Sequence, residues 1–158
     1  MSGQGASLSQ VDASGRISLR DYQLDELEDT VILAQGFDRS ILMFTEAQWN
    51  KFSQALVPEE EEEIDPDLDD LRRLFLGNKA EVDIDDRGRL KIPEGLREWA
   101  RLMPGSSRVM VLNIGTRFEI WEVGHYQEYM AARAPELKLI ARERTRRRRG
   151  EEAEGRDR

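Results

Sequence analysis

Two arginines in this chain each follow an aspartate by four residues, with a glycine directly before the arginine. Asp12 precedes Arg16, and Asp85 precedes Arg89. In one interpretation each pair staples its own turn, which contributes about 0.5 kcal/mol when the pair is exposed. In the other, the aspartate holds the guanidinium ready for phosphate or a guanine edge, where a bidentate pair discriminates by about 1–3 kcal/mol. The local residues leave both interpretations open.

Two more cationic residues accompany the second motif, Asp85 to Arg89. Arg87 and Lys91 lie on either side of Arg89, whereas Ser18 occupies the position of Lys91 in the first phrase. Two copies of the same arrangement favour a repeated surface that binds a repeated or symmetric partner.

The stretch Val82 to Trp99 shows which elements position these side chains. Apolar and polar residues alternate on both sides of a charged turn, which predicts a strand, a tight turn at Gly88 and a second strand. Pro93 has no N–H for a sheet but suits the start of a helix, so we expect a helix from there to about Leu102.

The same order of elements occurs twice. Residues Gln10 to Leu19 match the later phrase at a constant offset of 73, and each copy continues with a short helix, two apolar runs around a glycine turn, and another helix. Each half alone would bury only about 60% of its unfolded surface, so we expect the halves to share a core. The predicted organisation is a flexible N-terminus (1–9), a first repeat (10–57), an acidic linker (58–70), a linking helix with a second repeat (71–136) and an Arg-rich tail (137–158).

Capping signals locate two further helices. Thr45 and Gln48 form a capping box, and Asp65 followed by Pro66 starts a helix after the linker. The face of this second helix that we expect to be buried comprises Leu68, Leu71, Leu74 and Phe75. Residues 1–9 are expected to be disordered or a frayed edge strand, and residues 150–158 to be disordered.

Charge is segregated along the chain. Nine acidic residues lie between Glu59 and Asp70, so the rest of the chain carries +1 of the formal net charge of −8. Six arginines between Arg142 and Arg149 face a single Glu143. The acidic run is expected to be a solvated linker, with an autoinhibitory strip as the alternative, and the arginines are expected to add non-specific affinity for polyanions.

From the residues present we expect no transition-metal site, no acid–base catalysis and no membrane span. The chain has no cysteine and only one histidine, His125, so no transition-metal site is expected. Asp83, Asp85 and Asp86 cluster, but the adjacent arginines disfavour a raised carboxyl pKa and hence acid–base catalysis. No apolar run is long enough for a membrane span and no secretion signal is present, so a soluble, intracellular protein is expected.

Taken together, these motifs resemble the MraZ family. The resemblance rests on both Asp-x-x-x-Arg phrases, on Gly-Arg-Leu-x-Ile-Pro-x-x-Leu-Arg at 88–97, on Arg-Arg-Leu-Phe at 72–75, on Arg-Phe-Glu-Ile-Trp at 117–121 and on Gly-Phe-Asp-Arg at 36–39. It covers about residues 10–132. The first half lacks the Ile-Pro that follows the motif in the second half.

The resemblance implies a fold and a function. The fold would be α+β, with two pseudo-symmetric AbrB-like halves whose strands interleave in a small β-barrel with peripheral helices. The protein would be a DNA-binding transcriptional regulator, usually a repressor, of the division and cell-wall gene cluster. It would bind short direct repeats upstream of its own operon as a ring-shaped homo-oligomer.

The site residues carried over from the family are Arg16 and Arg89 for contact with double-stranded DNA, and Asp12 and Asp85 as orienting residues. We add Arg87 and Lys91 from their charge and position. No cofactor, metal, membrane or small-molecule substrate is implied. The alternative is an AbrB-fold protein-interaction module, antitoxin-like or a scaffold, without sequence-specific DNA binding.

Overall fold

The computed structural model describes residues 5–56 and 64–157. The run Glu59 to Glu63, on which the linker prediction rests, lies outside the described residues. The chain forms two compact units, Met1–Val123 and Gly124–Arg158. The first contains the first repeat, the second repeat as far as Val123 and all of the described strands, and the second is helical.

The elements of the first unit follow the predicted repeat. The first half contains β1 (Ala6–Gln10), β2 (Arg16–Ser18), α1 (Asp21–Leu24), β3 (Thr30–Gln35), a 3-10 turn η1 (Phe37–Arg39), β4 (Ile41–Phe44) and α2 (Glu46–Gln54). The second contains α3 (Pro66–Leu76), β5 (Ala80–Asp83), β6 (Arg89–Lys91), α4 (Glu94–Ala100), β7 (Arg108–Asn113) and β8 (Phe118–Glu122). The predicted α+β class is confirmed, and the N-terminal segment forms an edge strand from Ala6.

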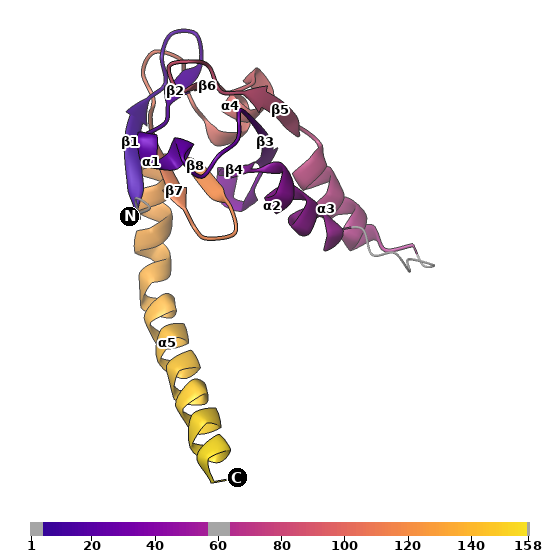
Figure 1. Cartoon of the computed structure of the whole chain (residues 1–158), viewed down its shortest axis with the longest axis vertical. Helices are drawn as coiled ribbons and strands as arrows, with labels where there is room; N and C mark the ends of the chain where they lie inside the picture. Colours follow the sequence, from indigo (N-terminus) through magenta and orange to yellow (C-terminus); the bar gives the residue numbers. More distant parts are fainter. Residues whose placement is uncertain (1–4, 57–63, 158) are drawn as a thin grey trace. The chain divides into compact units, whose positions relative to one another are not determined.

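The strands of the two halves interleave (Figure 1). The main sheet is antiparallel with the order β1-β7-β8-β4-β3-β5, and β2 pairs with β6 in a separate two-stranded sheet, here called the ribbon. Exchanging the halves converts this order into itself, because β1 corresponds to β5, β3 to β7 and β4 to β8. The repeat is therefore a pseudo-twofold symmetry of the structure.

The expected barrel is not formed. Within the described residues the main sheet ends at β1 on one side and at β5 on the other, and neither sheet closes on itself. The reason lies in the two turns: each edge strand leaves the main sheet at its turn and continues into the ribbon. The strands that follow these turns, β2 and β6, pair with each other in the ribbon.

Two apolar clusters hold the sheet from both faces. On one face, alternate residues of β3 and β4 pack with the inner face of the ribbon and with α4; on the other, they pack against α2 and α3. Burial on both faces explains why β3 and β4 are continuous apolar runs. Phe75 anchors α3 as expected, but Leu71 is 36% exposed rather than buried.

The helix starts agree with the capping signals. Thr45 accepts from the Gln48 N–H, and Gln48 reaches back to the Thr45 N–H, so the predicted capping box is confirmed. Asp65 accepts from the N–H groups of Asp67 and Leu68 at the start of α3.

The C-terminal unit differs from its prediction. Helix α5 (Val123–Arg156) runs through Pro135 and Gly150, so the expected disorder from residue 150 is wrong up to Arg156. Ion pairs within the helix, Arg147 with Glu143 and Arg148 with Glu152, support its later turns. No helix in the described residues is both long and apolar enough to cross a membrane.

Candidate nucleic-acid interface

The first turn is organised by one carboxylate oxygen. Asp12 Oδ1 accepts from the N–H of Ser14 at 2.9 Å, from its hydroxyl at 2.7 Å and from the N–H of Arg16 at 2.9 Å. Gly15 completes the turn with a φ of +87°, a region that favours glycine. The aspartate thus fixes the backbone at the point where β2 begins.

The second turn repeats this geometry. Asp85 Oδ1 accepts from the N–H groups of Arg87 and Arg89, both at 2.9 Å, and Gly88 has a φ of +73°. In addition, Asp85 Oδ2 accepts from Arg89 Nε at 3.2 Å. Both of the interpretations offered for these aspartates are therefore compatible with the second turn, where one carboxylate caps the backbone and bonds the guanidinium.

The two arginines are held differently. Arg89 is bonded directly by Asp85, whereas Arg16 Nη1 donates to the Ser14 hydroxyl, which in turn donates to Asp12. Arg87 occupies the position in the second turn that Ser14 occupies in the first. The serine-mediated link of Arg16 consequently has no counterpart in the second turn.

These hydrogen bonds lower the pKa of both aspartates. For Asp12 the largest cause is the bond from the Arg16 N–H, followed by the Ser14 hydroxyl. For Asp85 it is the bond from the Arg89 N–H, and the Arg87 N–H also contributes. Both carboxylates therefore stay ionised to lower pH than an unpaired aspartate, and the turns keep their caps at neutral pH.

The ribbon brings the cations of the two halves onto one face. Arg16 lies opposite Lys91, and Ser18 lies opposite Arg89. Ile17 and Leu90, which alternate with them, are at most 1% exposed and belong to the core. Because side chains alternate across a strand, Arg16, Arg89 and Lys91 share the outward face of the ribbon.

Distances across this face follow from strand geometry. Directly opposite residues have Cβ atoms about 4.5–5.5 Å apart, and diagonal neighbours such as Arg16 and Arg89 are about 7–8 Å apart. Within the described residues, Arg89 is the one cation of this face with an ion pair, and its side chain remains 37% exposed. The positive charges of this face repel one another at this spacing. Water or a bound anion beside them reduces that repulsion.

Each turn is supported from behind by the other half. A Cβ added to Gly15 would lie 1.7 Å from Arg97 Nη1, and one added to Gly88 would lie 2.8 Å from Leu24 Cδ1. Arg97 and Leu24 are equivalent under the repeat offset of 73. Since Arg97 is half-buried and donates to the Ile92 carbonyl, its guanidinium holds the first turn in place.

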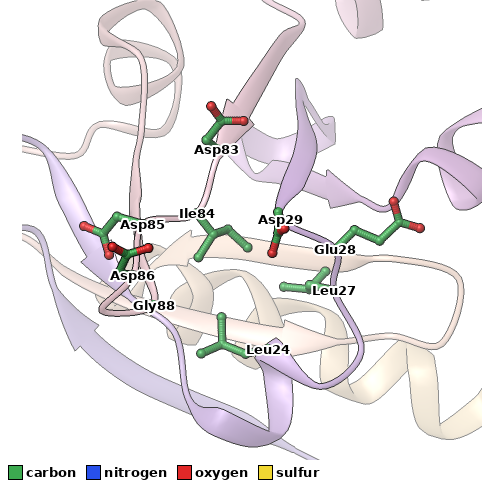
Figure 2. Close-up of a pocket in the computed structure, with 9 residues that line it drawn as sticks. All are labelled: Leu24, Leu27, Glu28, Asp29, Asp83, Ile84, Asp85, Asp86 and Gly88. Carbon is green, nitrogen blue, oxygen red and sulfur yellow. The ribbon is translucent and has the colours of Figure 1, made fainter.

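An acidic pocket lies beside the second turn (Figure 2). Leu24, Leu27 and Ile84 point toward one another in a pocket of about 630 Å³, and five carboxylates surround them: Glu28, Asp29, Asp83, Asp85 and Asp86. No group of carboxylates or histidines in the described part of the chain is arranged to hold a metal ion. The negative charge there repels polyanions, so an anionic partner would approach the outward face of the ribbon.

The outward face of the ribbon has the chemistry of a polyanion site. A two-stranded β-ribbon fits the major groove of B-DNA, and arginine and lysine bond both phosphates and the O6 and N7 of guanine. The fold brings together all four predicted cations, Arg16, Arg87, Arg89 and Lys91, on the ribbon and the turn that leads into it.

Sequence reasoning missed Arg20. It follows β2 in extended conformation and lies two residues beyond Ser18, with the buried Leu19 between them, so it continues the outward row of Arg16 and Ser18. The alternation of apolar and polar residues was the available signal. The repeat does not mark this position, because the corresponding residue of the second copy is Pro93.

Known proteins resemble this chain over most of its length. A family model described as "MraZ protein, putative antitoxin-like" matches residues 75–149. "Transcriptional regulator MraZ" of Cupriavidus pinatubonensis is 34% identical over 141 residues, which cover 84% of this chain and 94% of that protein. Proteins of the same name from Cupriavidus taiwanensis and Burkholderia mallei are 33% identical with the same coverage.

Proposed function

Because this chain belongs to the MraZ family of transcriptional regulators, we propose that it is a sequence-specific DNA-binding protein, not an enzyme, that uses the outward face of its ribbon. The observation that carries the proposal is the register of β2 and β6, which gathers Arg16, Arg89 and Lys91 on one face. Arg87 adds charge at the turn. Asp12 and Asp85 act as orienting residues because each caps the turn that presents its arginine.

The biological target follows from the family resemblance. We propose that the protein acts in the cytoplasm, at the nucleoid, as a repressor of the division and cell-wall gene cluster. Its target is a set of short direct repeats upstream of its own operon. A ring of identical subunits would place several ribbons on successive repeats, and the effective concentration of linked sites then makes weak individual contacts sufficient.

The test is binding of the full-length protein to DNA from upstream of its own gene, measured by fluorescence anisotropy against a scrambled duplex over a salt series. We expect a preference for the native duplex and a log–log salt slope of about −0.9 per phosphate neutralised. Arg89→Ala should weaken binding with the oligomer intact. Equal binding of the native and scrambled duplexes by the wild-type protein would contradict the proposal.

A second candidate is a protein-interaction module, favoured by the family description as antitoxin-like and by an exposed aromatic side chain. Phe37, at the tip of the β3–β4 connection, is 58% exposed and touches Phe75 of α3 edge-on at 5.3 Å. A pull-down that recovers one stoichiometric protein partner, together with no DNA affinity at low salt, would replace the first proposal with this one.

A further inference from the structure

The Arg-rich stretch near the C-terminus belongs to one continuous helix, α5 (Figure 1). Six arginines lie between Arg142 and Arg149, and all six are exposed. None of the described residues of α5 is buried, so these turns do not serve the core. A helix that is polar on all sides is stabilised by charge pairs along its own surface or serves a contact with another molecule. The arrangement of its charges therefore determines what α5 can bind.

The cations of α5 divide into two groups around the helix. Arg147 and Arg148 are bonded by Glu143 and Glu152, at 2.6 and 3.5 Å. Successive residues of a helix are rotated by about 100°, which places four cations within about 40° of Arg142 on one side of α5. We call these four residues the basic stripe: Lys138, Arg142, Arg146 and Arg149.

The glutamates of α5 lie beside the basic stripe or behind it. From Glu136 to the end of the helix, each is rotated by about 80° or more from Arg142. The two nearest ones, Glu143 and Glu152, bond arginines outside the stripe. Glu128 shares the side of the stripe but lies about 15 Å before it along the axis. Within the described residues, none of the four cations of the stripe has an ion pair.

The basic stripe destabilises the helix when nothing is bound to it. Lys138 with Arg142 and Arg142 with Arg146 are like-charge pairs at a spacing of i,i+4, which is unfavourable in a helix. Thr145 donates its hydroxyl to the Ala141 carbonyl at 2.8 Å, so the donors left for a ligand are those of the cations. An anion beside them relieves the repulsion and accepts from more than one guanidinium. A hollow of about 430 Å³ within the stripe is lined by Ala141, Arg142, Thr145, Arg146 and Arg149.

Resting on the DNA binding of the proposed function, we propose that the basic stripe of α5 is a second DNA-contacting surface, which binds the phosphate backbone without reading the sequence. From Lys138 to Arg149 the stripe spans about 16 Å. Phosphates of one strand follow each other at about 3.4 Å along the duplex axis, so the four cations have several phosphates within reach. The ribbon supplies the sequence preference, and the stripe supplies affinity for DNA of any sequence.

The composition of α5 favours DNA over an anionic membrane as the partner. A helix that lies on a membrane needs an apolar face that enters the lipid. Alongside the stripe from Arg142 to Arg149, the opposite side of the helix carries Arg144 and Arg147 instead of apolar residues. A phosphate backbone requires only the cations, because its contacts are charge-assisted hydrogen bonds.

The first experiment compares Arg146→Gln, in the basic stripe, with Arg144→Gln on the opposite side of α5. Both changes remove one exposed charge without a described ion pair, and glutamine favours helices about as well as arginine. The full-length proteins are titrated with a scrambled duplex over a salt series, and circular dichroism checks the helix.

For each subunit in contact with the duplex, Arg146→Gln should reduce the log–log salt slope by about 0.9 and lower affinity about 8-fold at 0.1 M salt, which is the effect of one lost phosphate contact. Arg144→Gln should change both much less, because the far side of a helix lies about one Debye length further from the DNA. The ratio of affinities for the native and scrambled duplexes should stay at its wild-type value in both variants.

Equal affinities and slopes of Arg146→Gln and Arg144→Gln would overturn the inference, because the side of the helix would then have no effect. An unchanged slope in Arg146→Gln together with a changed oligomeric state in sedimentation would assign the stripe to a contact between chains, and would also overturn it. A wild-type protein without preference for its own DNA would overturn the proposed sequence specificity alone, since the contribution of the stripe is measured on the scrambled duplex.

Amide hydrogen exchange provides a second readout on the wild-type protein. Bound phosphates remove the repulsion along the stripe, so exchange between residues 138 and 149 should become slower when the scrambled duplex is present at saturation. Unchanged exchange in this part of α5 would contradict binding by the stripe.

Discussion

Asp85→Asn separates the two roles that the structure gives to this carboxylate. The amide oxygen of asparagine can still accept from the N–H groups of Arg87 and Arg89, so the turn remains capped. The group that replaces Oδ2 is a donor, and it cannot accept from Arg89 Nε as the carboxylate does at 3.2 Å. Arg89 therefore loses its restraint while the backbone keeps its shape.

The size of the effect follows from the geometry of the pair. Both side chains are 37% exposed, so their ion pair contributes about 0.2–1 kcal/mol. Ordering a freed arginine on DNA costs about 0.5–1.5 kcal/mol. We expect a loss of about 1 kcal/mol in specific binding, which is about a 5-fold fall in the ratio of specific to non-specific affinity.

Asp85→Asn also removes a negative charge, and this second effect raises affinity for DNA of any sequence. Affinity for a scrambled duplex should rise slightly in Asp85→Asn because repulsion from the phosphates is reduced. Asp86→Asn is the matched control, because it removes the same charge from an exposed neighbour that has no bond to Arg89 in the described structure. The control should raise affinity for both duplexes and leave their ratio unchanged.

The assay is fluorescence anisotropy with the upstream and scrambled duplexes at one salt concentration, with urea unfolding as a check of stability. If the ratio of the two affinities is the same in Asp85→Asn and Asp86→Asn, the aspartate does not orient Arg89 for DNA. The cap on the turn would then be its whole role.

Three further predictions concern stability. Gly15→Ala should lower the free energy of unfolding by about 2–3 kcal/mol in urea titrations, because it places a Cβ at positive φ and pushes Arg97 off the Ile92 carbonyl; an unchanged midpoint would contradict the described turn. The lowered pKa values of Asp12 and Asp85 stabilise the fold above the ordinary value of 3.8, and this contribution should be lost as the pH falls through the folded values. Urea midpoints of the wild-type protein should therefore drop more steeply below pH 4 than those of Asp85→Asn, and parallel curves would refute the assignment. Gly150→Ala should stabilise the end of α5 by about 1 kcal/mol, because its Cβ meets nothing within 4 Å; slower amide hydrogen exchange around residue 150 is the expected result, and unchanged exchange would argue against a helix there.

Local features of the fold were predictable from the sequence because their causes are local. The glycine turns, the aspartate caps and the capping box at Thr45 depend on residues within five positions of one another, and the structure has them where the sequence indicates. The repeat also gave the correspondence of the two halves. Strand partners were not predictable in this way, since β5 and β6 follow one another in sequence yet pair with β3 and β2 respectively.

The candidate site could be proposed from the sequence as a set of residues, but not as a surface. Spacing identified Arg16 and Arg89, and charge added Arg87 and Lys91. Only the register of the ribbon shows that three of these share a face and that Arg20 extends the row. Disorder was expected from Gly150, a residue that usually weakens helices, whereas α5 continues to Arg156 and the ion pair of Arg148 with Glu152 spans that glycine.

The interleaving of the halves also determines when the protein folds during synthesis. Strand β1 pairs with β7, β2 with β6, and β4 needs β8 beside it. When only the first repeat has emerged from the ribosome, β1 and β2 have no partners, and β3 and β4 can pair only with each other. We expect the nascent chain to remain without its main sheet until residues near Glu122 emerge, and to be exposed to chaperones and proteases over that interval.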